Sequence, residues 1–510
     1  MTKRRLCGVL FGTLLLALGL GGPGATAAPG TPKVAWSPCH RDLGPFECGT
    51  VQVPLDYSAS DGGAISIAVV RLPASDPGRR IGSLFINPGG PGGSGFDFAL
   101  FAAPILFDDE VRARFDIVGF DPRGVIRSTA LRCFGNDKQW APFFTPFAFP
   151  VTDAEEAIWQ DADRFLTGQC DQRGGRMASH ISTANVARDL DALRQAVGDD
   201  KLTYVGYSYG SAIGVQYANL FPGNVRALVV DGVLDPVAWT TGTGDGTTVP
   251  MTIRLGSHLG SQATLQEFFR LCDAGTCAFG PNSAARFAAL AAKLTANPVP
   301  FDYSTLILIT LQALYDSSGW EGFAQVLADV ESAAATATAL SPARQAVVKA
   351  MLQRPMYITK RGLPANYENF LESFPGVVCA DSVNPTSYAA FSAAADSATG
   401  YFGRLWGWTA SICAVWNARD DDRYLGPFTR VTANPVLVVG NRFDPATPYA
   451  GAVKVASLLP NSRLLTVNGW GHTSLFLSAC ADDAIDSYLL TSVPPPSGTT
   501  CNQDVTPFAG

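Results

Sequence analysis

The sequence predicts an α/β fold: a mostly parallel sheet with helices on both faces and an inserted, mainly helical lid. Between residues 81 and 231, short runs of β-branched and aromatic residues alternate with helical stretches, the pattern of a covered parallel sheet. From about 236 to 427, Ala-rich helical patterns replace the strands, which return only afterwards. With 510 residues, 47% hydrophobic and 16% charged, the chain suits one large domain with an insertion, or two domains.

These signals divide the chain into four predicted segments: an export signal (1–28), a first part of the core (29–235), the helical insertion (236–427) and a C-terminal part of the core (428–510). The predicted core strands are 49–54 and 64–72, joined as a hairpin, then 81–87, 115–120, 225–230, 435–440 and 463–467. The predicted helices are 183–197, with Thr183 as its cap, then 283–297, 305–316, 322–337, 343–352 and 479–490.

The first residues have the three zones of an export signal. Lys3, Arg4 and Arg5 form a basic start, residues 6–20 an apolar core, and residues 25–28 a small-residue cleavage zone. A membrane anchor is less well supported, because the apolar run is short and broken by glycines. The residues after Arg5 fit a twin-arginine signal poorly, so we favour general secretion. We therefore predict a secreted protein without a membrane span.

The chain is acidic. Its formal net charge of −7 becomes −10 when the three basic residues of the signal are removed. An acidic chain without a basic cluster argues against nucleic acid and anionic membranes as partners. No feature of the sequence indicates an obligate protein partner.

Ten of the eleven cysteines lie outside the signal, and an even number in an exported chain indicates disulfides. The sequence does not determine their connectivity, but close couples along the chain suggest five pairs: Cys39–Cys48, Cys133–Cys170, Cys272–Cys277, Cys379–Cys413 and Cys480–Cys501. Metal binding is the alternative. Only Cys39 stands beside a histidine, His40, and no Cys-x-x-Cys motif occurs, so we predict no metal site.

Residues 206–210 read Gly-Tyr-Ser-Tyr-Gly and match the G-x-S-x-G nucleophile elbow. A strand-like run precedes this motif and a helical stretch follows it, as a strand-to-helix turn requires. Glycines are needed on both sides because a Cβ there would collide with neighbouring backbone. The sequence therefore predicts that Ser208 is a nucleophile.

A nucleophilic serine needs a base, and the base needs an orienting carboxylate. His472 lies in a glycine-rich loop directly after a predicted strand, and Asp444 lies in the loop after the preceding strand. The order Ser208, Asp444, His472 is that of the α/β-hydrolases. The other histidines, His40, His180 and His258, lack this context, so we interpret them as structural.

Acyl transfer also needs donors for an oxyanion. The backbone N–H of Tyr209, directly after the nucleophile, is one candidate. The second is the N–H of Gly90, in the glycine-rich loop 88–95 that follows the strand 81–87. We interpret the motif 121–124 (Asp-Pro-Arg-Gly) as structural, with Arg123 pairing with carboxylates near the site.

Taken together, several motifs resemble the secreted actinobacterial tripeptidyl aminopeptidases, relatives of proline iminopeptidase in the α/β-hydrolase superfamily. These motifs occupy 87–95, 119–124, 206–210, 231–236, 444–448 and 471–472, and the resemblance includes the cysteine couples and Cys379-Ala380-Asp381. It spans nearly the whole mature chain and is specific in the core but weak in the insertion. Proline iminopeptidases carry a histidine where this chain has Pro88, which argues against release of single prolines.

The resemblance implies a serine exopeptidase that removes short peptides, often tripeptides, from free N-termini without a metal or cofactor. Such an enzyme needs a carboxylate for the substrate's ammonium group. The acidic candidates in the insertion are Glu321, Glu368, Glu372 and Asp381, and the sequence does not select among them. Any one of them is more often a surface charge.

Two other functions stay open. Some relatives are described as carboxylesterases, which use the same triad on small esters. A non-enzymatic binding protein of this fold usually lacks a triad member, whereas this chain has all three. Dehalogenases and epoxide hydrolases need an aspartate where this chain has Ser208.

Overall fold

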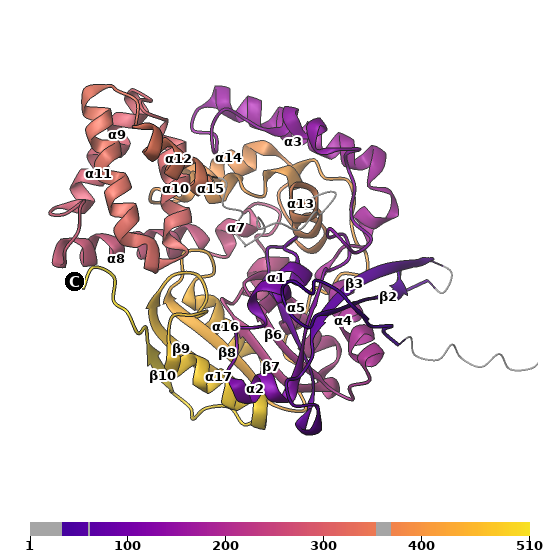
Figure 1. The fold of residues 1–510 in the computed structure, drawn as a ribbon. Helices are drawn as coiled ribbons and strands as arrows, with labels where there is room; N and C mark the ends of the chain where they lie inside the picture. The colour runs from indigo at the N-terminus through magenta and orange to yellow at the C-terminus, as the bar shows by residue number, and fades with distance from the viewer. Residues whose placement is uncertain (1–32, 60–61, 353–368, 510) are drawn as a thin grey trace, which may run out of the picture.

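The computed structural model describes residues 33–59, 62–352 and 369–509 (Figure 1). Within these residues, ten strands form one sheet in the order β1-β2-β3-β5-β4-β6-β7-β8-β9-β10. The strands are β1 (Ser37–Pro38), β2 (Glu47–Pro54), β3 (Ala64–Leu72), β4 (Gly82–Asn87), β5 (Phe115–Phe120), β6 (Leu202–Tyr207), β7 (Val225–Asp231), β8 (Val436–Phe443), β9 (Ser462–Trp470) and β10 (Thr500–Asn502). The predicted export signal and Glu368 lie outside the described residues.

The sheet is parallel from β5 to β10, and its antiparallel part is the hairpin β2–β3 with its neighbours β1 and β5. Every residue of β4, β5 and β6 is buried, which is expected of central parallel strands that are covered on both faces. The predicted α/β class and the predicted hairpin are confirmed.

Successive residues of a strand face opposite sides of the sheet, so each face has its own hydrophobic core. Tyr204 of β6 packs in the core that includes residues of α4 (Thr183–Val197), α5 (Tyr209–Leu220) and α16 (Tyr449–Leu458). Its neighbour Val205 packs in the opposite core, with residues of α1 (Gly95–Ala102), α2 (Asp109–Arg114) and α17 (Ala479–Thr491). The helix predicted over 183–197 is α4, but its N-cap is Ser182, whose hydroxyl accepts from the Asn185 N–H, and not Thr183.

A layer of helices lies between β7 and β8 in the chain and covers one end of the sheet (Figure 1). It contains α6 (Pro236–Thr240), α7 (Met251–Arg254), α8 (Ser257–Ala274), α9 (Ser283–Ala296), α10 (Tyr303–Leu314), α11 (Trp320–Thr336), α12 (Pro342–Leu352), α13 (Phe370–Asp381), α14 (Tyr388–Ser397) and α15 (Gly403–Trp408). Helices α8 to α12 and α15 share a separate core around Phe268 and Trp320.

An earlier segment joins this layer. Helix α3 (Asp153–Arg173) follows β5 in the chain but packs beside the helices near α14 (Figure 1). The indole N–H of Trp159 donates to the hydroxyl of Ser411 at 3.0 Å, and that hydroxyl donates to Asp163 at 2.6 Å. The helical layer therefore combines two separate stretches of the chain.

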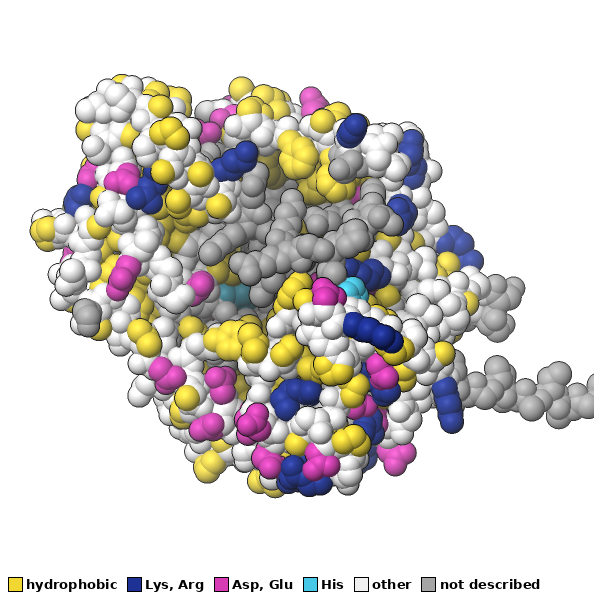
Figure 2. Space-filling view, in the orientation of Figure 1, with side chains coloured by type: hydrophobic (Ala, Val, Ile, Leu, Met, Phe, Trp, Pro, Cys, Tyr) yellow, Lys and Arg dark blue, Asp and Glu magenta, His cyan; other side chains and the backbone are white. Residues whose placement is uncertain are grey.

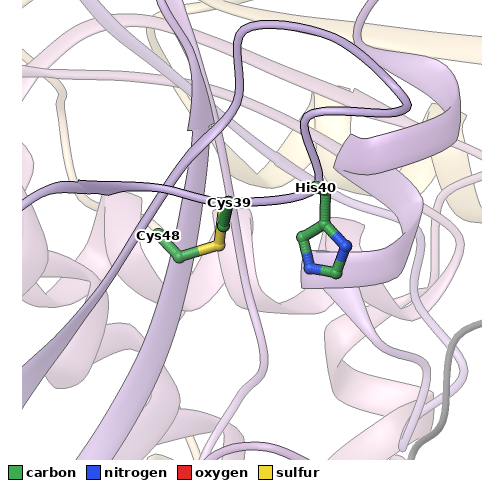
Figure 3. A group of neighbouring side chains, drawn as sticks. All are labelled: Cys39, His40 and Cys48. Atoms are coloured by element: carbon green, nitrogen blue, oxygen red, sulfur yellow. A yellow bond between two sulfur atoms is a disulfide. The ribbon is translucent and has the colours of Figure 1, made fainter.

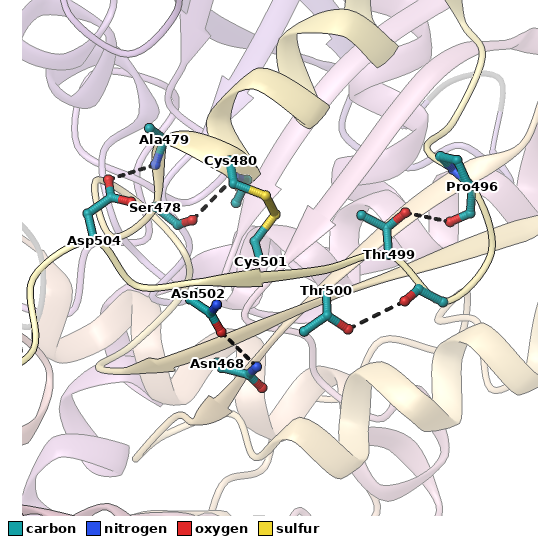
Figure 4. Close-up of a disulfide and its surroundings, with 12 residues drawn as sticks. Asn468, Ser478, Ala479, Cys480, Pro496, Thr499, Thr500, Cys501, Asn502 and Asp504 are labelled. Atoms are coloured by element: carbon teal, nitrogen blue, oxygen red, sulfur yellow. Dashed lines mark hydrogen bonds between the residues drawn. A yellow bond between two sulfur atoms is a disulfide. The ribbon is translucent and has the colours of Figure 1, made fainter.

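All five predicted disulfides are present: Cys39–Cys48, Cys133–Cys170, Cys272–Cys277, Cys379–Cys413 and Cys480–Cys501. Figure 4 shows the last of them joining the start of α17 to β10. Beside it, the carboxylate of Asp504 accepts the backbone N–H of Ala479 at 2.9 Å. These links attach the C-terminal strand to the helix under the sheet.

The surface carries charges of both signs. On the face seen in Figure 2, acidic and basic side chains are interspersed over the sheet-bearing part, and hydrophobic side chains border the boundary with the helical layer. Among the described residues, no helix combines the length and the apolar character that crossing a bilayer requires.

Candidate active site

Ser208 sits in the turn between β6 and α5, with backbone angles φ 55° and ψ −125°. Such angles are rare for a residue with a side chain and mark a strained turn. The Ser208 N–H donates to the carbonyl of Asp231, at the end of the neighbouring strand β7, at 2.8 Å. Ser208 is thus held at the end of the sheet where β6 and β7 stop.

The two glycines of the motif are required by close backbone packing. A Cβ on Gly206 would lie 2.3 Å from the carbonyl oxygen of Gly210. A Cβ on Gly210 would lie 2.7 Å from the carbonyl oxygen of Asn87. Both contacts are shorter than any real Cβ makes, so the spacing of the motif follows from the geometry of the turn.

Asp444 and His472 follow the neighbouring strands β8 and β9, and the structure brings them together. Both carboxylate oxygens of Asp444 lie 2.9 Å from Nδ1 of His472. Burial by itself raises the pKa of Asp444, but the charge of His472 and hydrogen bonds from it and from the backbone N–H groups of Thr473 and Thr447 hold it below its ordinary value. An ionised Asp444 therefore favours the imidazole tautomer that carries its proton on Nδ1.

Thr447 also contacts this pair, although no sequence motif indicates a role for it. Its hydroxyl lies 2.9 Å from Asp444 Oδ2 and 3.3 Å from His472 Nδ1. Its backbone N–H donates to the other Asp444 oxygen at 2.8 Å. A threonine three residues after the acid is the available signal, since a side chain at that spacing can fold back onto the carboxylate.

The loop that carries His472 is held by its neighbours on three sides. The amide of Asn441 donates to the carbonyls of Gly471 and Thr473, on either side of the histidine. The backbone N–H of His472 donates to the carbonyl of Tyr315, directly after α10, at 2.9 Å. The ring of Tyr315 meets the imidazole edge to face, with centroids 4.9 Å apart.

Asp231, the last residue of β7, also holds the loop that carries His472. Its buried carboxylate accepts the backbone N–H of Ser474 at 2.9 Å and the Ser474 hydroxyl at 2.7 Å. Its carbonyl is the group that holds Ser208. A Cβ on the next residue, Gly232, would lie 3.4 Å from Cε1 of His472. The end of β7 therefore holds the turn of Ser208 and lies close to the imidazole of His472.

The glycine-rich loop after β4 packs directly on the serine turn. A Cβ on Gly89 would lie 2.8 Å from the nitrogen of Tyr209 and 2.9 Å from Cβ of Ser208. Tyr209 is the first residue of α5, so its N–H has no acceptor within the helix. The N–H of Gly89 donates to the side chain of Asn87 at 2.9 Å, and the N–H of Gly90 stays the predicted donor in this loop.

The remaining candidates have other surroundings. His40 lies next to the Cys39–Cys48 disulfide (Figure 3). These three residues bring potential metal-ligand atoms together, but both sulfurs are bonded to each other and offer no thiolate. Arg123 forms a fully buried ion pair with Asp189 of α4, which agrees with a structural role.

The acidic residues predicted as candidates for the substrate's ammonium group differ in their burial and in their hydrogen-bond partners. Glu321 is exposed at the start of α11, whereas Asp381 is buried and accepts hydrogen bonds from Thr183 and Trp239. Glu372 is fully buried in α13. It directly precedes Ser373, whose hydroxyl would lie 2.4 Å from a Cβ on Gly92 in the glycine-rich loop.

Comparison with known proteins gives matches over nearly the whole chain. A family profile described as "alpha/beta hydrolase fold" matches residues 82–247, and one described as "TAP-like protein" matches residues 398–501. The serine protease Hip1 of Mycobacterium tuberculosis is 33% identical over 536 residues, which cover 94% of each chain.

Two further relatives carry different names. Carboxylesterase B of Mycobacterium tuberculosis is 32% identical, over 94% of this chain and 92% of the relative. The tripeptidyl aminopeptidase of Streptomyces coelicolor is 30% identical, over 95% of this chain and 88% of the relative. With identity of this level over this length, the chain belongs to the tripeptidyl aminopeptidase-like serine peptidases of the α/β-hydrolase superfamily.

Proposed function

We propose that this serine peptidase is an exopeptidase that removes short peptides, tripeptides above all, from free N-termini through an acyl-enzyme. The observation that carries the proposal is the pairing of Asp444 with Nδ1 of His472, close to the same strand end that holds Ser208. This combination supplies a base, its orienting acid and a nucleophile turn, as acyl transfer requires.

In the proposed reaction, Nε2 of His472 takes the proton of the Ser208 hydroxyl as its oxygen attacks the scissile carbonyl. Asp444 stabilises the imidazolium that results. The N–H groups of Tyr209 and Gly90 donate to the oxyanion of the tetrahedral intermediate. His472 then gives its proton to the leaving amine, and water attacks the acyl-enzyme by the same steps to regenerate Ser208.

Preference for a chain end follows from the helical layer above the sheet end, which favours a terminus over an internal loop. We propose Glu372 as the carboxylate that meets the substrate's ammonium group. It is buried in α13, directly before Ser373, which packs on Gly92 of the glycine-rich loop, whereas Glu321 is exposed.

The test compares kcat/KM on the p-nitroanilide of Ala-Ala-Pro, on its N-acetylated form and on a short-chain p-nitrophenyl ester. An exopeptidase cleaves the free peptide at least about 100-fold better than the blocked one, because the blocked substrate has no ammonium group for the carboxylate to bind. Equal cleavage of the two peptides would contradict the proposal. Efficient cleavage of the ester alone would support the carboxylesterase alternative, which the name of one relative favours.

We further propose that the enzyme is secreted. Five disulfides in the described part of the chain suit an oxidising compartment. Expression with the native N-terminus in an actinobacterial host, followed by N-terminal sequencing of the culture supernatant, tests this. A mature protein that begins near residue 29 is expected, and an intact residue 1 on exported protein would contradict it.

A further inference from the structure

A buried carboxylate in the helical layer has no part in the proposed reaction. Asp381 is the last residue of α13 and is 2% exposed. Its Oδ1 accepts the backbone N–H of Thr183 at 2.8 Å. Its Oδ2 accepts the indole N–H of Trp239 at 2.9 Å and also the hydroxyl of Thr183.

The Thr183 hydroxyl extends this network to the nucleophile turn. It lies 2.6 Å from the phenol oxygen of Tyr209. A hydroxyl carries one proton, and the Thr183 proton goes to Asp381, so the phenol of Tyr209 must donate to Thr183. The ring of Tyr209 also packs against Trp239, with centroids 5.7 Å apart. Both contacts of the Tyr209 side chain therefore lead to Asp381.

Tyr209 is the residue that follows the nucleophile. Its backbone N–H is the proposed oxyanion donor, and its backbone continues from the strained turn at Ser208. A donor stabilises the oxyanion only when it points at the place where charge develops. A side chain that is 2% exposed and bonded at its far end restricts how far this backbone can rotate.

We propose that Asp381 is a positioning residue that holds the oxyanion donor Tyr209 in place through Thr183. The helical insertion thereby sets part of the catalytic geometry of the core, because Asp381 of α13 positions a donor in the turn between β6 and α5. This inference rests on the proposed function, because it takes Ser208 as the nucleophile and the Tyr209 N–H as the donor.

The competing explanation is that Asp381 only caps α4, whose first residue is Thr183. A second carboxylate of the insertion provides a matched control. Asp420 is also fully buried and binds the same helix end, accepting the Ser182 N–H at 3.1 Å and the Asn185 amide at 2.9 Å. It has no bond to Thr183 or Tyr209 among the described hydrogen bonds.

The experiment measures the rate at which a fluorophosphonate probe labels the protein, because that reaction uses the oxyanion donors for peptidases and esterases alike. D381N and Y209F are each expected to slow labelling about 10-fold, since small displacements of catalytic groups have effects of this size. The double variant should be no slower than either single one. D420N should label within twofold of wild type, although both aspartate variants lower the melting temperature.

Equal slowing in D381N and D420N, or wild-type labelling in D381N, would overturn the inference. T183V decides the question if D381N does not fold, since it removes the hydroxyl that joins Asp381 to Tyr209, whereas Asp381 keeps its bonds to the Thr183 N–H and to Trp239. Labelling that persists in S208A would instead refute the proposed nucleophile. Failure of the site and failure of the positioning role are therefore distinguishable.

Discussion

The turn that carries the proposed nucleophile and the loops that carry the proposed acid and base are held in different ways. Backbone packed on backbone holds the turn, as the glycine contacts at Gly206 and Gly210 show. Hydrogen bonds from the helical layer hold the loops: Ser257 of α8 donates to the carbonyl of Ala446, and the carbonyl of Tyr315 accepts from His472. The turn is therefore sensitive to added volume, whereas the loops are sensitive to lost donors and acceptors.

The largest effect is expected from the acid itself. D444N keeps the shape of the side chain but removes the charge that holds the proton on Nδ1 of His472. We expect kcat to fall about 10⁴-fold with a small change in KM, because the imidazole then favours the wrong tautomer. Steady-state kinetics on the peptide substrate measure this. A fall of less than about tenfold would show that another group orients the base.

A substitution that adds volume to the turn comes next. G206A places a Cβ 2.3 Å from the Gly210 carbonyl, so the turn must move. We expect kcat/KM to fall about 100-fold and the free energy of unfolding to fall by about 1–3 kcal/mol. G223A is the control, since its Cβ would meet nothing within 4 Å. A fully active G206A would show that packing does not determine the turn.

Loss of one donor to the acid tests the loops. T447V keeps the volume of the side chain but removes the hydroxyl 2.9 Å from Asp444. We expect kcat to fall about 10-fold with KM unchanged, because the orientation of the acid matters most in the transition state. T447S retains a hydroxyl and should recover most of the activity. Stopped-flow and steady-state measurements on both variants decide this, and equal loss in T447S would assign the effect to the methyl group.

The smallest effect on catalysis is expected far from both regions, in α3. Burial raises the pKa of Asp163 from 3.8 to about 7, so the folded protein binds this proton more tightly than the unfolded chain does. The stability that this proton contributes is lost as the pH rises through about 7. The free energy of unfolding should fall between pH 4 and pH 8, and D163N should remove on the order of 2 kcal/mol of that fall without changing kcat/KM. Urea denaturation at both pH values measures it. D161N, on the exposed side of α3, should behave as wild type, and an unchanged pH dependence in D163N would contradict the assignment.

Features that depend on local pattern could be predicted from the sequence. The serine turn and the alternation of strands and helices each leave a short signal, and the predicted fold class agrees with the structure. The five suggested cysteine pairs also agree with it, although the sequence alone did not determine them. The paired Asp444 and His472 were also foreseeable, since each follows a predicted strand. Thr183 was wrongly predicted as a cap because Ser182, the residue before it, competes for the same role and wins the bond from Asn185.

Contacts between distant segments could not be predicted. Tyr315 holds His472 through a backbone carbonyl, which every residue has, so no side-chain pattern marks it. Asp381 meets Thr183 across 198 positions of the chain, and a single aspartate near a cysteine gives no indication of its partner. That α3 belongs to the helical layer could not be predicted for the same reason, because only the folded chain shows that Asp163 meets Ser411.

The bond between the His472 N–H and the Tyr315 carbonyl bears on protein engineering. Exchanging the whole insertion between relatives to change substrate preference would replace the segment that anchors the proposed general base, His472. A chimaera that keeps residues 303–316 from the parent and varies only the outer helices α11 and α12 should retain turnover.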